Sequence, residues 1–170
     1  LYMLGGGWTI GGIDTHDVVC KYLANLLGWK VFSEGYRLAP EYKYLVLLED
    51  CDRALAWITE NAELLNINPE KLSVGGDSAG GNLSASLCIK RKEEGGLLPE
   101  RQLLIYPGVD HDDDYPSMQD FAEGYFLTED LMTWFTKNYI RVNEDLDDFY
   151  VSPIRYPNPK GLPPAVVITA

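Results

Sequence analysis

A serine between glycines is the strongest chemical signal in this sequence. The segment Gly76-Asp77-Ser78-Ala79-Gly80 follows an apolar stretch typical of a strand and precedes a run of small residues typical of a helix. A serine on such a sharp turn projects its hydroxyl at the carboxyl end of the strand, where the helix N-terminus adds a positive dipole. Ser78 is therefore the candidate nucleophile for attack on an acyl carbon, and Ala79 would offer its backbone N–H to the oxyanion. The alternative is an ordinary glycine turn, because short motifs recur by chance.

A glycine loop near the start of the chain offers a second part of such a site. Gly5, Gly6 and Gly7 follow a strand-like segment, and glycine leaves backbone N–H groups unhindered. The N–H groups of Gly5 and Gly6 are expected to join that of Ala79 in an oxyanion hole, where one donor typically contributes about 3 kcal/mol to transition-state stabilisation. A phosphate-binding loop is the alternative, but no Lys-Ser/Thr pair follows and the spacing is not G-x-G-x-x-G.

Strand and helix patterns alternate along the whole chain. Helical spacing of apolar residues predicts helices over about 15–27, 49–65, 79–92 and 129–139, the last capped by Thr128. Strands are expected over about 1–4, 29–33, 71–74, 103–106 and 165–169. This order predicts one α/β domain with a mostly parallel sheet covered by helices on both faces.

Residues 110–160 are more than a crossover between two core strands requires. We expect them to form a partial helical cap or lid over the site. The aromatic residues Trp8, Tyr125 and Phe126 are candidate substrate-binding residues, and Trp134 belongs to the same group. Aromatic residues at such positions equally often pack in a core or lid.

Composition excludes several kinds of partner. The net charge of −12 disfavours nucleic acid and anionic lipid surfaces. No apolar run approaches the roughly 18 residues that a membrane-spanning helix needs. Cys20, Cys51 and Cys88 lack paired spacing and are interpreted as reduced, buried thiols, which favours a cytoplasmic protein that needs no metal.

Motifs spread over nearly the whole chain resemble one known family. In chain order they are Leu4-Gly5-Gly6-Gly7-Trp8, Tyr36-Arg37-Leu38-Ala39-Pro40-Glu41, Glu49-Asp50-Cys51, Gly75-Gly76-Asp77-Ser78-Ala79-Gly80-Gly81-Asn82, Leu104-Ile105-Tyr106-Pro107, Glu123-Gly124-Tyr125-Phe126-Leu127-Thr128, Val151-Ser152-Pro153 and Leu162-Pro163-Pro164-Ala165. The sequence resembles the hormone-sensitive-lipase-like branch of the α/β-hydrolases. The resemblance implies an α/β-hydrolase fold with a helical cap and hydrolysis of short acyl esters without metal or cofactor. The partner would be a small-molecule ester, and a homodimer is compatible with the sequence.

The sequence departs from that family at two places. The family's glycine loop begins with a histidine that supports it by hydrogen bonding, and Leu4 cannot do so. Tyr42-Lys43-Tyr44-Leu45 replaces a His-Pro-aromatic-Pro turn outside the chemistry.

The other members of a catalytic triad are not evident between residues 1 and 170. In this fold the acid and then the histidine follow the serine, and we expect both beyond Ala170, which would leave these residues inactive by themselves. His16 precedes the serine, and His111 lacks a suitably placed acid. The acidic run at 110–114 lacks the glycine of a calcium loop and is interpreted as a solvated loop.

Two other classes of function stay open. A catalytically inactive pseudo-hydrolase would bind a small molecule or a protein without turnover. A truncated gene product would fold poorly, because its sheet would expose apolar edges. Arg37 with Glu41 or Asp50 is interpreted as an ion pair that holds a turn, in preference to a substrate contact.

Overall fold

Five parallel strands form one sheet at the centre of the molecule. The computed structural model describes residues 1–111 and 115–169. The order across the sheet is β2-β1-β3-β4-β5. The strands are β1 (Tyr2–Met3), β2 (Ser33–Glu34), β3 (Val74–Asp77), β4 (Gln102–Ile105) and β5 (Ala165–Ile168). In this register Met3 lies beside Gly76, and Asp77 lies beside Ile105. The predicted parallel sheet is confirmed.

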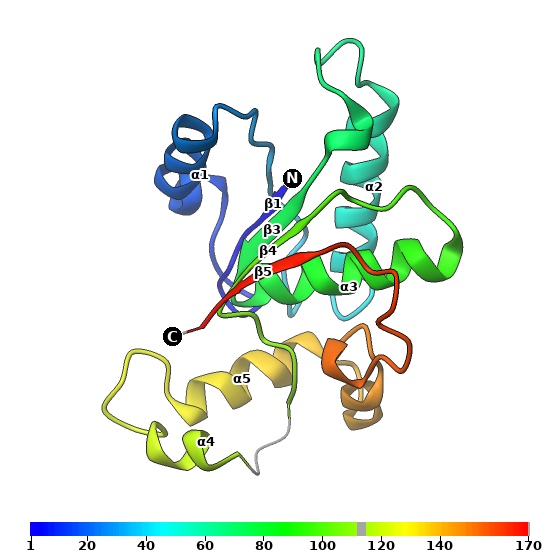
Figure 1. Cartoon of the computed structure of the whole chain (residues 1–170). Helices are drawn as coiled ribbons and strands as arrows, with labels where there is room; N and C mark the ends of the chain where they lie inside the picture. Colours follow the sequence, from blue (N-terminus) through cyan, green and yellow to red (C-terminus); the bar gives the residue numbers. More distant parts are fainter. Residues whose placement is uncertain (112–114, 170) are drawn as a thin grey trace.

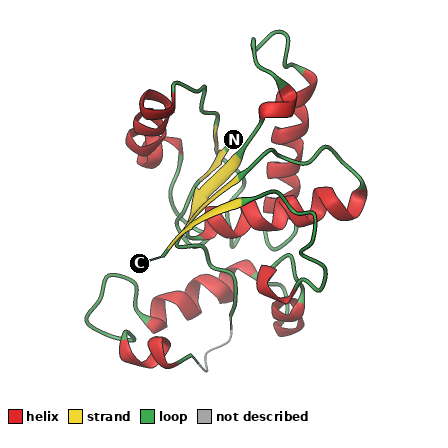
Figure 2. Ribbon diagram, viewed as in Figure 1, coloured by secondary structure: helices red, strands yellow, loops and turns green. Residues whose placement is uncertain are grey.

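Helices cover both faces of the sheet (Figure 1). Helix α1 (Ile13–Leu27) lies on one side, and α2 (Val46–Glu60) and α3 (Ala79–Glu94) lie on the other. Figure 2 shows the strands enclosed between these helices. The core between the layers includes the fully buried side chains of Met3, Leu47, Leu83, Leu87 and Cys88.

Helix α3 is the central helix of the fold. Every residue from Ala79 to Ile89 is buried. Small side chains in its first turns, including Gly80, Gly81, Ser84 and Ala85, let the neighbouring backbone approach closely. The helix ends at Gly95, which adopts a left-handed conformation with φ 73°.

Several predicted boundaries are shifted for identifiable reasons. Helix α1 is capped by Gly12, and Thr15 acts from within the first turn, where its hydroxyl bonds the Gly12 backbone. The strand expected over 71–74 begins only at Val74, because Pro69–Lys71 forms a 3₁₀ turn capped by Asn68. The strand expected over 29–33 begins only at Ser33 and ends one residue later than predicted, at Glu34, where it pairs with the two residues of β1.

The long segment between β4 and β5 lies beyond the carboxyl ends of the strands (Figure 1). It contains α4 (Pro116–Asp120), α5 (Glu129–Tyr139) and two 3₁₀ turns, Asn143–Asp147 and Pro153–Arg155. Helix α5 has the predicted bounds, and the Thr128 hydroxyl accepts the Leu131 N–H at 3.3 Å. Asp112, Asp113 and Asp114 of the acidic run lie outside the described residues. Among the described helices, none is long and apolar enough to cross a bilayer.

The three cysteines are free thiols in buried positions, as predicted. Cys51 lies on α2 and Cys88 on α3, and both are fully buried. Burial raises the pKa of the Cys88 thiol to about 12. These thiols therefore stay protonated and contribute to the fold as small apolar side chains.

Candidate active site

Ser78 lies on a strained corner where β3 meets α3. Its backbone angles are φ 51° and ψ −116°, and for a residue other than glycine the left-handed region costs about 1–2 kcal/mol. The Ser78 N–H donates to the Ile105 carbonyl at 2.9 Å, and the Ser78 carbonyl accepts from Asn82 in the first turn of α3. The neighbouring strand and helix thus hold the corner in place, as the strand–serine–helix pattern predicted.

Two glycines of the motif are required by close contact with β1. A Cβ at Gly76 would lie 2.3 Å from the Met3 carbonyl oxygen, and one at Gly80 would lie 2.0 Å from the same atom. Both distances are far below any van der Waals contact, so neither position accepts a side chain. This requirement distinguishes the motif from an ordinary glycine turn.

The glycine loop lies beside this corner in an unusual conformation. Gly6, Gly7 and Trp8 have φ values of 118°, 55° and 59°. A Cβ at Gly7 would lie 2.1 Å from the Phe135 ring, so the loop packs directly on α5. Among the described residues, the N–H groups of Gly6 and Gly7 donate to no protein acceptor. These two amides are therefore available for a ligand oxygen.

The structure corrects the expectation for Gly5. Its N–H donates to Oδ1 of Asp77 at 3.2 Å, so this amide hydrogen is already engaged. Leu4 is buried, and its carbonyl accepts from the Tyr36 hydroxyl at 2.5 Å. The loop is thus fixed at its first residues without a supporting histidine.

The Asp77 carboxylate is the polar centre of this region. Oδ1 also accepts from the Tyr2 hydroxyl at 2.8 Å, and Oδ2 lies 3.3 Å from His16 Nε2. Burial and the adjacent Asp77 raise the pKa of Tyr2, which keeps its hydroxyl protonated as a donor. The other ring nitrogen of His16 lies 2.9 Å from the Thr15 hydroxyl.

Neither histidine of the chain is hydrogen-bonded to the serine. His16 faces Asp77 and Thr15, and the His111 ring lies 5.7 Å from the Trp8 ring between centroids. Within the described residues, no hydrogen bond joins Ser78 Oγ to His16 or His111. His16 lies in the first turn of α1, close to the start of the helix.

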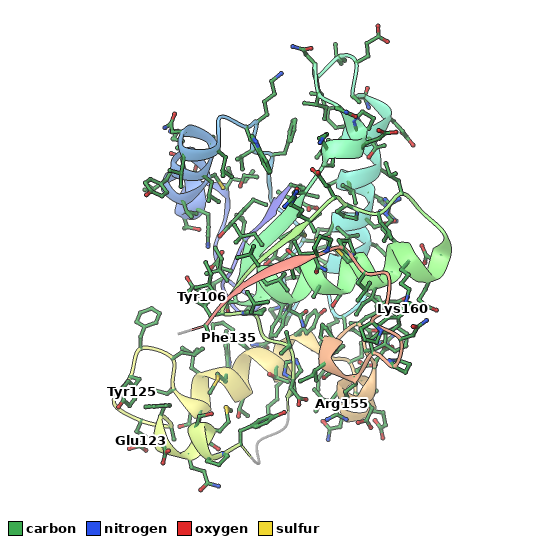
Figure 3. All side chains as sticks on the ribbon, in the orientation of Figure 1. Tyr106, Glu123, Tyr125, Phe135, Arg155 and Lys160 are labelled. Carbon is green, nitrogen blue, oxygen red and sulfur yellow. The ribbon has the colours of Figure 1, made fainter. Side chains whose placement is uncertain are left out.

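Of the four aromatic residues expected at the substrate, Trp8, Tyr125 and Phe126 are not brought together. Trp8 is 5% exposed and stacks on Tyr139 with ring centroids 4.4 Å apart, so it is part of the core. Tyr125 is exposed in the loop before α5, and Phe126 is 100% exposed. Figure 3 places Tyr125 at the far side of the insertion, whereas Phe135 and Tyr106 lie near the carboxyl end of the sheet.

Asn82 connects the corner at Ser78 to both ends of the segment of residues 110–160, which is called the insertion. Its side chain is fully buried, and Nδ2 donates to the carbonyls of Gly108 at 2.7 Å and Val151 at 2.8 Å. Gly108 precedes the insertion and Val151 lies near its end. One amide group thus fixes both connections next to the serine.

Comparison with known protein families shows to which family the chain belongs. A match to the family described as alpha/beta hydrolase fold covers residues 1–170. The chain belongs to the α/β-hydrolase family. This confirms the resemblance and fold class predicted from the sequence.

Similar proteins are named as esterases. The α/β-hydrolase chain is 40% identical to the carboxylic ester hydrolase LipN of Mycobacterium tuberculosis, over 98% of this chain and 46% of LipN. It is 36% identical to the ethyl acetate hydrolase of Pseudomonas putida, over 100% of this chain and 54% of that protein. A hyperthermophilic esterase from Pyrobaculum calidifontis superposes with a TM-score of 0.92 at 40% identity, over 98% of this chain and 54% of that one. The chain therefore spans about half the length of the relatives that it matches.

A hollow elsewhere in this α/β hydrolase does not contain the serine. It has a volume of about 550 Å³ and lies at the amino ends of the strands, between residues such as Leu23, Phe32 and Gln102. Ligands of open parallel sheets bind at the carboxyl ends. We therefore place the candidate site at Ser78 and not at this hollow.

Sequence reasoning missed three residues of the site. Asp77 was part of the recognised motif, but its contact with Gly5 joins residues 72 positions apart. Asn82 likewise reaches Val151, 69 positions away, and Phe135 reaches Gly7 from α5. The ion pair of Arg37 with Asp50, in contrast, was correctly expected. Arg37 Nε and Nη2 each donate to this carboxylate at 2.7 Å.

Proposed function

We propose that the whole protein containing this chain is a carboxylic ester hydrolase with Ser78 as its nucleophile. The observation that carries the proposal is the strained serine beside unpartnered backbone amides at the carboxyl end of a parallel sheet. The names of its relatives, a carboxylic ester hydrolase and an ethyl acetate hydrolase, support the same reaction.

The reaction follows from the available groups. Ser78 Oγ attacks the acyl carbon while a histidine takes the hydroxyl proton, and the carbonyl oxygen becomes an oxyanion. The N–H groups of Gly6, Gly7 and Ala79 stabilise that charge, with Gly7 replacing Gly5 of the sequence-based expectation. The tetrahedral intermediate then expels the alcohol, which takes the proton from the histidine. Water, activated by the same histidine, releases the acid and restores the serine.

The histidine and its orienting acid belong, in this proposal, to parts of the whole protein outside these residues. His16 is engaged by Asp77 and Thr15. His111 lies against Trp8, whose side chain belongs to the core. The catalytic machinery represented here is thus the nucleophile and the oxyanion hole, and no cofactor enters the scheme.

The substrate is a small-molecule ester. Tyr106 is 50% exposed and follows Ile105, whose carbonyl accepts the Ser78 N–H, so it provides apolar surface near the serine for an acyl or alcohol group. The insertion of residues 110–160 would form part of the wall around this site. Tyr125 and Phe126 stay predictions for the outer part of that wall.

The experiment is the Ser78→Ala substitution in the full-length protein, with hydrolysis of p-nitrophenyl acetate as the measurement. We expect turnover to fall by about a million-fold, which leaves only the residual rate supported by the oxyanion hole and substrate binding. Ser86→Ala is the matched control, because Ser86 is a buried serine within α3 whose hydroxyl donates to the Tyr150 carbonyl. It should retain activity. Equal hydrolysis by the wild type and Ser78→Ala would reject the proposal.

The alternative of a non-catalytic binder is less well supported. The glycine loop that begins at Leu4 is anchored through Tyr36 and Asp77, which favours an oxyanion hole that is held in place. A binder would bind an ester without releasing alcohol. Failure of the wild-type full-length protein to release p-nitrophenol, together with retained binding of the ester, would favour it.

A further inference from the structure

The nucleophile and the glycine loop are connected by one half-buried carboxylate, that of Asp77. Asp77 directly precedes Ser78, and its side chain is 15% exposed. Oδ1 accepts the N–H of Gly5 and the hydroxyl of Tyr2, while Oδ2 faces His16. The group therefore contacts β1, the glycine loop and α1 at the same time.

The loop backbone fits against this carboxylate. A Cβ at Gly5 would lie 2.0 Å from Asp77 Oδ2 and 2.8 Å from its carboxyl carbon. Glycine at position 5 is therefore required by the approach of the carboxylate, not by its own backbone angle. This contact fixes the point where the loop begins.

Beyond that point the loop is held by contacts away from the serine corner, since the Gly6 carbonyl accepts from the Thr9 and Ile10 N–H groups and the Trp8 carbonyl accepts from the Ala39 N–H. Gly6, Gly7 and Trp8 have positive φ values in succession, and glycine adopts many other conformations at no steric cost. At its start, the Leu4 side chain offers no hydrogen bond, and the anchors are the Tyr36 hydroxyl on the Leu4 carbonyl and Asp77 on the Gly5 amide. Of these two anchors, only Asp77 belongs to the serine corner.

We propose that Asp77 is a positioning residue that sets the distance between the oxyanion amides and the serine. Because its carboxylate and Ser78 belong to neighbouring residues of one rigid corner, it holds the loop in register with the nucleophile. This inference rests on the proposed function. Asp77 does not touch the reacting atoms; it acts through the amides of Gly6 and Gly7. His16 keeps the second carboxylate oxygen in place from α1.

The test compares Asp77→Leu with Asp77→Asn in the full-length protein. Asn keeps an acceptor oxygen for Gly5 and Tyr2, whereas Leu has a similar size and no acceptor. We expect Asp77→Leu to lower kcat about 100-fold, the typical effect of one lost oxyanion donor, with KM changed by less than about threefold. Asp77→Asn should retain kcat within about tenfold of the wild type, since the acceptor persists.

A second readout separates positioning from general damage. A thionoester places sulfur where the oxyanion forms, and sulfur accepts hydrogen bonds weakly. Wild type should hydrolyse the oxygen ester much faster than its thiono analogue, and Asp77→Leu should reduce that ratio. A general loss of folded protein would lower both rates equally.

Asp50 provides matched controls. Its side chain is 17% exposed, and it also accepts a backbone N–H and a side-chain donor, both from Arg37. Asp50→Leu and Asp50→Asn should leave kcat and the oxygen-to-sulfur ratio unchanged in the folded protein. If Asp77→Leu fails to fold, Tyr2→Phe removes one partner of the carboxylate and should lower kcat and the same ratio to a smaller degree.

The outcomes distinguish this inference from the proposed function. Activity that survives Ser78→Ala would reject the proposed function. Activity that requires Ser78 but is unchanged in Asp77→Leu would reject only the positioning role. Equal losses in Asp77→Asn and Asp77→Leu, or an unchanged oxygen-to-sulfur ratio in Asp77→Leu, would also reject it.

Discussion

The serine corner and the insertion of residues 110–160 differ in what determines their structure. At the corner, backbone atoms of β1, β3 and α3 touch so closely that Gly76 and Gly80 cannot carry a side chain. In the insertion, by contrast, large side chains such as Phe121, Tyr125 and Phe126 are about half exposed or more. The part proposed to carry out the reaction is thus determined by backbone contacts, and the part proposed to face the substrate presents side chains. Sequence changes should affect the two parts in different ways.

The largest effect on stability is expected from Gly80→Ala. Its Cβ would lie 2.0 Å from the Met3 carbonyl, and a forced shift of two packed backbone segments should lower the free energy of unfolding by more than about 4 kcal/mol. The matched control is Gly124→Ala in the insertion, which has φ 84° and no atom within 4 Å of the new Cβ. There only left-handed strain of about 1 kcal/mol is expected. Urea unfolding of the full-length protein measures both, and equal losses would contradict the comparison.

A smaller effect is expected where the two regions meet. Asn82→Ala removes the donor of the Gly108 and Val151 carbonyls inside the core, and leaving them unpaired should cost about 3 kcal/mol. Asn61→Ala is the control, because Asn61 Nδ2 donates to the Trp57 carbonyl at an exposed position. It should cost less than about 0.5 kcal/mol. An equal loss of unfolding free energy in both variants would show that Asn82 does not connect the serine corner to the insertion.

The smallest expected effect is a dependence of stability on pH. Burial raises the pKa of Glu34, on β2, from 4.5 to about 7. Because the folded pKa is the higher one, Glu34 favours the fold most below pH 4.5, and this contribution is lost as the pH rises to 7. The loss should be about 2 kcal/mol, and Glu34→Gln should abolish it in urea unfolding between these pH values.

A carboxylate of the insertion should behave in the opposite way. Hydrogen bonds from Arg141 lower the pKa of Asp145 from 3.8 to about 2. Its contribution is therefore present above pH 3.8 and lost as the pH falls toward 2. Asp145→Asn consequently serves as the control for Glu34→Gln, because it should leave the slope between pH 4.5 and 7 unchanged. If the pH dependence of the unfolding free energy disappears in Asp145→Asn, Glu34 is not its source and the prediction is wrong.

Local sequence patterns predicted the elements that local interactions determine. Helix α5 has its predicted bounds because the Thr128 cap and the helical spacing lie within one segment. The serine corner was predicted because glycine, serine and the helix start are adjacent. The bounds of β2 were not predicted, since a strand ends where its partner ends, and β1 offers only two residues.

The details of the site depend on contacts between distant residues. That Gly5 gives its amide to Asp77, and not to an oxyanion, follows from the packing of β1 against β3. The positions of Trp8 in the core and of Phe126 on the surface follow from how the insertion packs. Residue type alone does not separate an aromatic side chain of the core from one that contacts substrate.

The contact of both motif glycines with the Met3 carbonyl has a consequence for how such a protein can evolve. A carbonyl oxygen is present whatever side chain occupies position 3, so the geometry at Ser78 tolerates exchange of that side chain for another of similar size. The same holds for Leu4, whose carbonyl accepts the hydrogen bond from the Tyr36 hydroxyl. Side chains at positions 3 and 4 can therefore change during evolution, while the backbone contacts that set the geometry at Ser78 are retained.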